Sequence, residues 1–100
     1  APREVIGKVV EEVEGNLIAV GLREDMTEAF RVPVSELYQR LSAGNDVKYV
    51  VFDGVVTQRL LDLFRERVGT YYLIGARTSD QLDVPPNVKV STFEVIKRVA

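Results

Sequence analysis

The sequence predicts an α+β fold: an N-terminal antiparallel β-meander, then a βαβ unit with parallel strands, and a C-terminal helix. In the first half, short segments rich in Val, Ile and Leu alternate with polar turns, as in antiparallel sheets. In the second half, a helical apolar spacing separates two nearly continuous apolar runs, as in parallel βαβ units. The chain has 100 residues and no linker-like stretch, so we expect one domain over residues 1–100.

The predicted meander has three short strands joined by two polar turns. Gly15 and Asn16 tolerate the positive φ that the first turn requires. Pro33 belongs at the end or edge of the third strand, because it has no N–H to donate. The predicted strands are residues 5–13, 17–22 and 28–34.

A two-turn helix is predicted after the meander. Ser35 is a suitable N-cap, and Leu37 and Leu41 lie one turn apart. Gly44 lies where a helix C-terminal glycine is expected.

The predicted βαβ unit begins with the apolar run 47–52, which Asp53 and Gly54 should end. Thr57 can cap a helix of about three turns, and Gly69 can terminate it. One apolar stripe on this helix comprises Leu60, Leu61, Phe64 and Val68. Residues 71–74 form the next predicted strand, closed by Gly75, and this crossover makes the two strands parallel.

The last segment is predicted as a loop, a short strand and a helix. The loop, residues 78–87, contains two adjacent prolines, and residues 88–90 form the strand. Ser91 and Glu94 have capping-box spacing, so a helix should follow over residues 95–99.

Composition excludes several classes of chemistry. There is no Cys and no His, so disulfides, thiolate nucleophiles, zinc–thiolate sites and His-dependent triads are absent. The net charge of −2 does not favour general binding of polyanions. No apolar run is long enough to cross a bilayer, so we expect no membrane partner and a reducing, cytoplasmic location.

A candidate binding site lies at the carboxyl ends of the two predicted parallel strands, where open α/β sheets bind ligands. This rim would offer one carboxylate, guanidinium groups and the N-terminus of the Thr57 helix to a phosphate or nucleotide. A purely structural role is the alternative: Asp53 pairs with Arg77 and accepts loop amides, while Thr57 only caps its helix. The candidate residues are Asp53, Thr57, Gln58, Arg59, Arg77 and Ser79.

We assign no catalytic residue, metal ligand or cofactor to this chain. A Mg²⁺ site usually combines one or two carboxylates with substrate phosphates, and no second acid adjoins Asp53. The glycines do not have the spacing of a phosphate-binding or dinucleotide-binding loop.

The sequence around Asp53 resembles the C-terminal region of archaeal DnaG-type primases. There a strand ending in Asp-Gly leads into Thr-Gln-Arg-Leu and a helix, and the next strand ends in Ile/Val-Gly. The matching segments here are residues 32–37, 50–63, 72–76 and 86–94. The resemblance covers most of residues 30–96 and is weakest over the opening segment.

The resemblance implies a parent protein that synthesises RNA primers with a Mg²⁺-binding Toprim domain and that associates with the archaeal RNA exosome and adenine-rich RNA. The Toprim pattern needs a Glu after one strand and an Asp-x-Asp at the end of another. Asp53-Gly54-Val55 lacks the second Asp, and Glu14 lies in a predicted turn. We therefore expect the catalytic carboxylates to lie upstream, outside this chain.

Two hypotheses follow. In the first, the chain is a non-catalytic accessory domain that docks an exosome or replication protein, or contacts RNA or single-stranded DNA. In the second, it is a self-sufficient nucleotide- or phosphate-binding module or enzyme that uses the Asp53/Arg77 rim. A polar pocket joining Asp53, Gln58, Arg77 and Ser79 would favour the second hypothesis.

Overall fold

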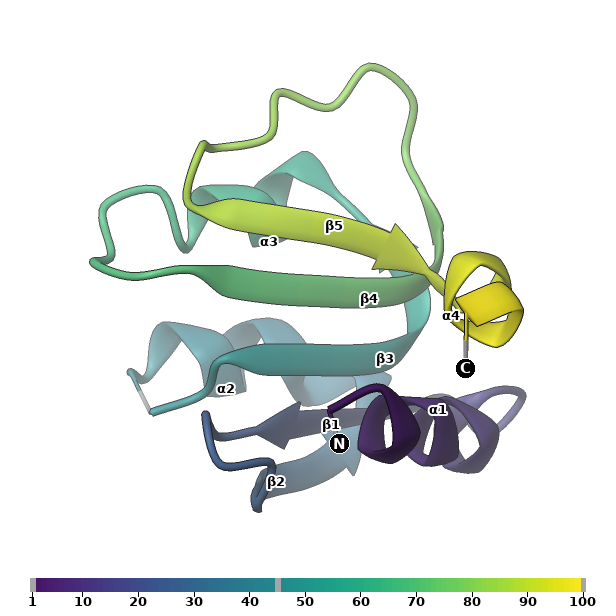
Figure 1. Cartoon of the computed structure of the whole chain (residues 1–100). Coiled ribbons are helices and arrows are strands. Elements are labelled where there is room, and N and C mark those ends of the chain that lie inside the picture. The colour runs from purple at the N-terminus through teal and green to yellow at the C-terminus, as the bar shows by residue number, and fades with distance from the viewer. Residues whose placement is uncertain (1, 45, 100) are drawn as a thin grey trace.

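A five-stranded mixed sheet forms the centre of the protein, with helices on both faces (Figure 1). The computed structural model describes residues 2–44 and 46–99. The strands are β1 (Ile18–Leu22), β2 (Glu28–Pro33), β3 (Tyr49–Val56), β4 (Tyr71–Thr78) and β5 (Val88–Thr92), in the spatial order β2-β1-β3-β4-β5. β1 pairs antiparallel with β2 and β3, whereas β3, β4 and β5 are parallel. The predicted α+β class, with antiparallel and then parallel strands and a C-terminal helix, is confirmed.

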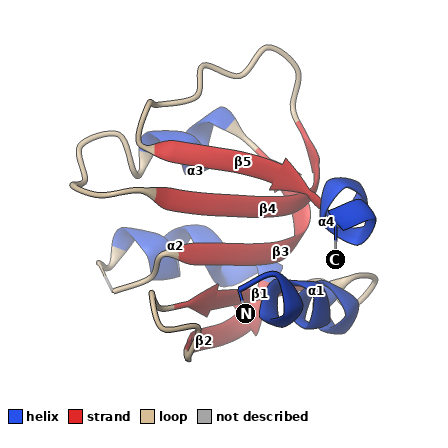
Figure 2. Ribbon diagram, viewed as in Figure 1, coloured by secondary structure: helices blue, strands red, loops and turns tan. Residues whose placement is uncertain are grey.

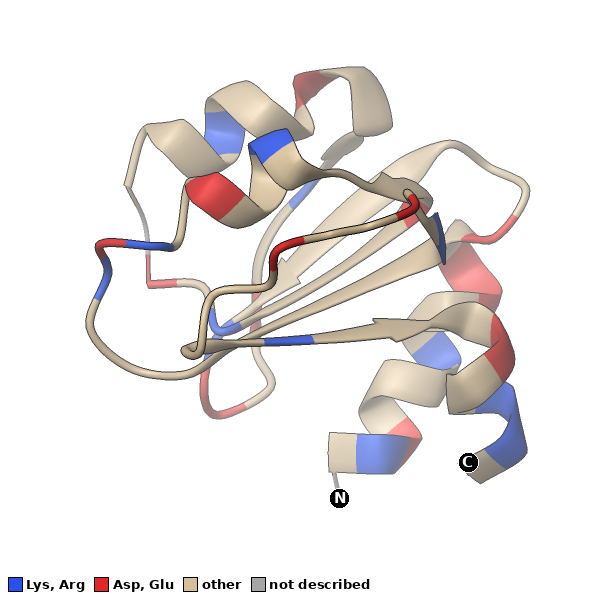
Figure 3. Cartoon of the chain, turned by 90° about the horizontal axis from the view of Figure 1, so that it is seen from above, with Lys and Arg blue, Asp and Glu red and all other residues tan. Residues whose placement is uncertain are grey.

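The helices make two layers. Helices α1 (Pro2–Val13) and α4 (Phe93–Val99) cover one face of the sheet (Figure 2). The 3₁₀ turn η1 (Val34–Glu36), α2 (Leu37–Ser42) and α3 (Gln58–Asp62) lie behind the sheet in the same view. Figure 3 shows the sheet edge-on between the two layers.

The prediction of a first strand over residues 5–13 is wrong, because this segment is helix α1. Its buried residues are Ile6, Val9, Val10 and Val13, the i, i+3, i+4, i+7 spacing of one helix face. The abundance of Val suggested a strand, but the apolar spacing is helical. The meander is therefore the β1–β2 hairpin with β3 added antiparallel to β1.

In the β1–β2 hairpin, a glycine on β1 lies opposite a phenylalanine on β2, and this contact constrains the register of the two strands. Gly21 pairs with Phe30, whose ring lies over the glycine so closely that a Cβ there would be 2.4 Å from the ring. Pro33 ends β2, as predicted. The predicted cap of the next helix is wrong: Ser35 lies inside η1, and α2 begins at Leu37 with no side-chain cap.

β3 continues beyond the predicted end at Asp53-Gly54. A register shift between Phe52 and Val55 carries it to Val56, and β4 likewise continues through Thr78. Gly75 makes this bulge possible, since a Cβ there would lie 2.8 Å from the Gly54 carbonyl oxygen. The strand interior thus includes the residues predicted as a turn.

The helix after Thr57 is shorter than predicted. α3 ends at Asp62, and the next backbone bonds run from residue i to i−3, as in Phe64 N–H to Leu61 O and Arg67 N–H to Phe64 O. Val68, predicted on the apolar stripe, is 92% exposed.

The capping residue of α4 also differs from the prediction. Ser91 and Thr92 belong to β5, and the Val95 amide donates to Thr92 Oγ1 at 3.5 Å, at the limit of a hydrogen bond. Glu94 forms an ion pair with Arg98, one turn further along the helix.

Candidate functional site

Asp53 ties β3 to the segment that precedes β1. Its Oδ2 accepts the Leu17 amide hydrogen at 2.9 Å, and Leu17 has a positive φ of 55°. The structure places no ion pair between Asp53 and Arg77 among the described residues. The structural alternative is therefore right that Asp53 accepts a backbone amide and wrong about its pairing with Arg77.

Thr57 and Ser79 mark the carboxyl ends of β3 and β4. Thr57 caps α3, because its Oγ1 accepts the Leu60 amide at 3.3 Å. The Ser79 amide donates to the Val56 carbonyl oxygen at 3.0 Å, which continues the β3–β4 pairing. Because both strands run further than predicted, Asp53 lies within the sheet rather than at its rim.

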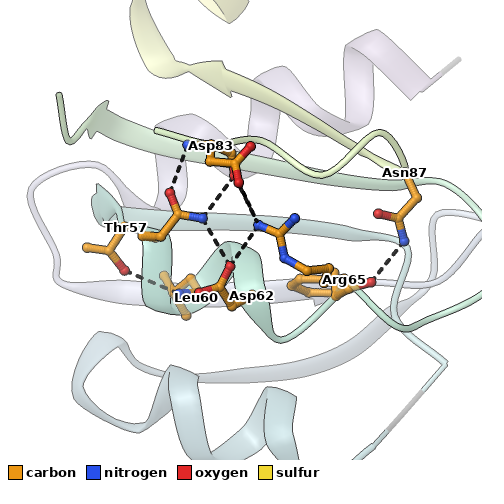
Figure 4. Close-up of polar contacts among 8 residues, drawn as sticks. Thr57, Leu60, Asp62, Arg65, Asp83 and Asn87 are labelled. Atoms are coloured by element: carbon orange, nitrogen blue, oxygen red, sulfur yellow. Dashed lines mark hydrogen bonds and ion pairs between the residues drawn. The ribbon is translucent and has the colours of Figure 1, made fainter. Parts of the chain in front are cut away.

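Gln58 fastens the long loop after β4 onto α3. Its side-chain oxygen accepts the Asp83 amide at 2.8 Å, and its side-chain nitrogen donates to the Asp83 carbonyl at 2.9 Å and to Asp62 at 3.0 Å. Arg65 joins the same cluster through Asp62 at 3.0 Å and Asp83 at 3.5 Å. Figure 4 shows Asp62 of α3, Arg65 of the turn that follows α3 and Asp83 of the loop converging on one another.

The charges in this cluster stabilise one another. The hydrogen bond from Gln58, and then that from Arg65, lowers the pKa of Asp62 below its ordinary value. The hydrogen bond to Asp62 raises the pKa of Arg65. All of these side chains are exposed or half-buried, so the cluster is a surface network that holds the loop against α3.

Arg59 lies against an aromatic ring. Its guanidinium carbon is 3.6 Å from the centre of the Tyr38 ring, a close cation–π contact. Arg59 and Thr57 line a cleft of about 220 Å³ between η1, α2 and β3. Arg77 is exposed and forms no ion pair or side-chain hydrogen bond within the described residues.

The six candidate residues do not share one pocket. Only Thr57 and Arg59 line the cleft described above, and no described pocket joins Asp53, Gln58, Arg77 and Ser79. The described ranges contain no group of three or more acidic side chains positioned to hold a metal ion. No helix in the described chain is long and apolar enough to span a membrane.

The sequence has many relatives among archaeal primases. It is 34% identical over 90 residues to the DNA primase DnaG of Thermococcus gammatolerans, 37% over 97 residues to that of Thermofilum pendens and 40% over 92 residues to that of Pyrobaculum islandicum. These matches cover 90%, 97% and 91% of the chain. The chain is homologous to a region of DnaG. It spans about a fifth of the length of these relatives: 20%, 22% and 22%.

These matches confirm the resemblance to DnaG and extend it over α1 and the opening hairpin. No protein-family model matches the chain. No solved structure matches it either.

One surface feature of this DnaG region was missed from the sequence. An apolar groove of about 300 Å³ lies between α1 and α4 and is floored by β3, β4 and β5. Two stacked rings, Tyr49 and Tyr72, stand on this floor with their centres 4.7 Å apart. Burial, and then the neighbouring Tyr72, raises the pKa of Tyr49 above its ordinary value. The signal that could have found the groove is the helical spacing of residues 5–13, which places α1 beside α4.

Proposed function

We propose that the chain is a non-catalytic accessory domain at the C-terminal end of a DnaG-type primase. In this role it contacts RNA or single-stranded DNA beside a catalytic domain located elsewhere in the longer protein. The observation that carries the proposal is that polar side chains of the candidate site form hydrogen bonds with the protein's own backbone. Asp53 holds the Leu17 amide, and Gln58 holds both backbone groups of Asp83.

Two cations near the carboxyl ends of β3 and β4 remain available to a phosphate backbone. Arg77 is exposed and unpaired within the described residues, and Arg59 is exposed beside the Tyr38 ring. The Arg59 guanidinium, stacked on the Tyr38 ring, suits single-stranded nucleic acid, because bases stack on guanidinium planes and the N–H groups donate to phosphate. Because the net charge is −2, any contact must rely on such local groups.

The rest of the proposal rests on the resemblance to DnaG. It comprises a cytoplasmic location, Mg²⁺ in the catalytic domain of the longer protein, and exosome or replication proteins as partners.

The alternative, a self-sufficient phosphate-binding module, needs Asp53 and Arg77 to act on one ligand. The Asp53 carboxylate already accepts a hydrogen bond from the Leu17 amide. If Asp53 turned toward a ligand, that amide would be left unpaired. Phosphate or nucleotide binding that both Asp53→Asn and Arg77→Ala abolish would favour this alternative.

Titration with labelled oligo(A) RNA and single-stranded DNA tests the accessory role. Measurements are made with and without Mg²⁺ and at two salt concentrations. We expect micromolar binding that weakens as salt rises. Arg59→Ala and Arg77→Ala should each weaken it several-fold, whereas the control Lys8→Ala, on α1 in the opposite layer, should not.

Two outcomes overturn parts of this proposal. Absence of binding at high protein concentration removes the nucleic-acid contact. Primer synthesis by the isolated chain with Mg²⁺ and nucleotides removes the non-catalytic assignment.

A further inference from the structure

The groove between α1 and α4 is an apolar surface that the fold leaves open. Its floor is formed by Tyr49, Tyr72 and Ile74, and Ile6 and Ile96 form its walls. In Figure 1 the N-terminal ends of β3, β4 and β5 lie in front with no helix across them. The volume of about 300 Å³ is at the lower end of the range for ligand pockets.

The apolar surface continues onto α4. Val99 on this helix lines the groove and is 50% exposed. Large apolar side chains that stay in water next to an apolar groove are typical of interaction surfaces.

The charged side chains that line the groove are both basic. Arg3 on α1 and Lys89 on β5 line it, and none of the lining residues is acidic. Neither cation forms an ion pair or hydrogen bond with another described side chain. The two neighbouring cations on α4 are already paired, Lys97 with Glu14 and Arg98 with Glu94.

We propose that this groove docks a polypeptide segment that inserts aliphatic side chains between α1 and α4 and places acidic residues against Arg3 and Lys89. The mainly apolar lining favours aliphatic side chains, which bury apolar area there without placing polar atoms of their own against it. The two unpaired cations favour an acidic segment over a basic one. This surface lies on the opposite face of the sheet from α3 and Arg59, so it is separate from the nucleic-acid contact proposed above.

Selection from a random peptide library displayed on phage tests this proposal with the 100-residue chain. The Val99→Asp variant serves for counter-selection, because a carboxylate in the apolar groove opposes binding. We expect the enriched peptides to combine two or more aliphatic residues with Asp or Glu. A labelled peptide from this set should then bind the chain reversibly in fluorescence anisotropy.

Matched variants identify the surface. Val99→Asp and Lys89→Glu should each weaken binding of that peptide about tenfold or more, whereas Val95→Asp and Lys8→Glu should change it less than about twofold. Val95 is the matched control for Val99, since both are half-exposed valines on α4 and only Val99 lines the groove. Circular dichroism of each variant confirms that it is folded.

Several results overturn the inference. They are peptides enriched equally on the Val99→Asp variant, enrichment of basic peptides, and no enrichment above the control. Self-association that Val99→Asp abolishes would assign the groove to a second copy of the chain. Oligonucleotide binding that Val99→Asp abolishes would assign it to nucleic acid.

Discussion

The two faces of the sheet are covered in different ways. On the α2–α3 face, polar side chains bind backbone groups far away in sequence: Asn87 holds the carbonyls of Phe64 and Arg67, and Arg67 holds the Leu41 carbonyl at 2.6 Å. On the α1–α4 face, the helices meet mainly through apolar side chains, with the 2.5 Å ion pair between Lys97 and Glu14 at the surface. On the first face, polar contacts hold the loops in place beside a cleft of about 220 Å³, whereas on the second an apolar groove of about 300 Å³ lies open.

The largest expected effect tests how well the α2–α3 face is packed. Phe64 is fully buried and its ring lies 5.0 Å from that of Tyr71. Phe64→Ala should lower the free energy of unfolding by about 3–5 kcal/mol, because it leaves a cavity. Urea unfolding measures this change. The control Val68→Ala, at a residue 92% exposed, should change it by less than about 0.5 kcal/mol.

The next prediction concerns the hydrogen bonds from Asn87 to backbone carbonyls on the same face. Asn87→Ala should cost about 1–3 kcal/mol in urea unfolding, because it leaves the Phe64 and Arg67 carbonyls without their donor. Asn16→Ala is the matched control, since its Nδ2 donates to the Glu12 carbonyl at an exposed site where water can replace it. An equal loss of unfolding free energy in the two variants would contradict a special role for the Asn87 hydrogen bonds.

Asp53→Asn separates a structural from a functional role at the predicted site. We expect a loss of about 1 kcal/mol of stability, because a neutral amide oxygen accepts the Leu17 N–H more weakly than a carboxylate does. Oligonucleotide affinity should stay within twofold of the wild-type value. Asp80→Asn, an exposed carboxylate in the loop, is the control. Lost affinity at unchanged stability would reverse the assignment.

The smallest expected effect is a pH dependence in the Asp62 cluster. The pKa of Asp62 is lower in the folded chain than its unfolded value of about 3.9. Its contribution to stability is therefore complete above about pH 4 and is lost as the pH falls through the lowered folded-state pKa. The stability difference between wild type and Asp62→Asn should be present at pH 7 and should shrink as the pH falls below about 4. A difference that does not change between pH 7 and acid pH would show that charge is not its cause.

Sequence reasoning succeeded where a local rule and the tertiary structure agree. Thr57 caps its helix, Pro33 ends its strand and Gly44 has the positive φ of a residue after a helix, 76°. The crossover rule placed β3 and β4 parallel, and this pairing is present. These features depend on a few neighbouring residues, so the sequence is sufficient to find them.

The errors arose where a distant contact overrides local preference. Asp53 and Gly54 are typical turn residues, yet Gly75 on the next strand makes room for them inside β3. The helix predicted to reach Val68 ends early, and Asn87 binds the carbonyls of Phe64 and Arg67 beyond its end. The contacts of Asp53 and Gln58 were not predicted for the same reason, since their partners Leu17 and Asp83 lie far away along the chain.

The contact between α1 and α4 affects how the chain folds during translation. Helix α1 leaves the ribosome before the other elements of this domain, with an apolar face that needs β1 and β3 beneath it. Its neighbour α4 comes only after β5 has been made. Until then, the β1–β2 hairpin can already form, but the apolar stripe from Ile6 to Val13 lacks its neighbour α4. Ribosome-bound chains that end before Phe93 should therefore present this stripe to chaperones, and release of α4 would end that interval.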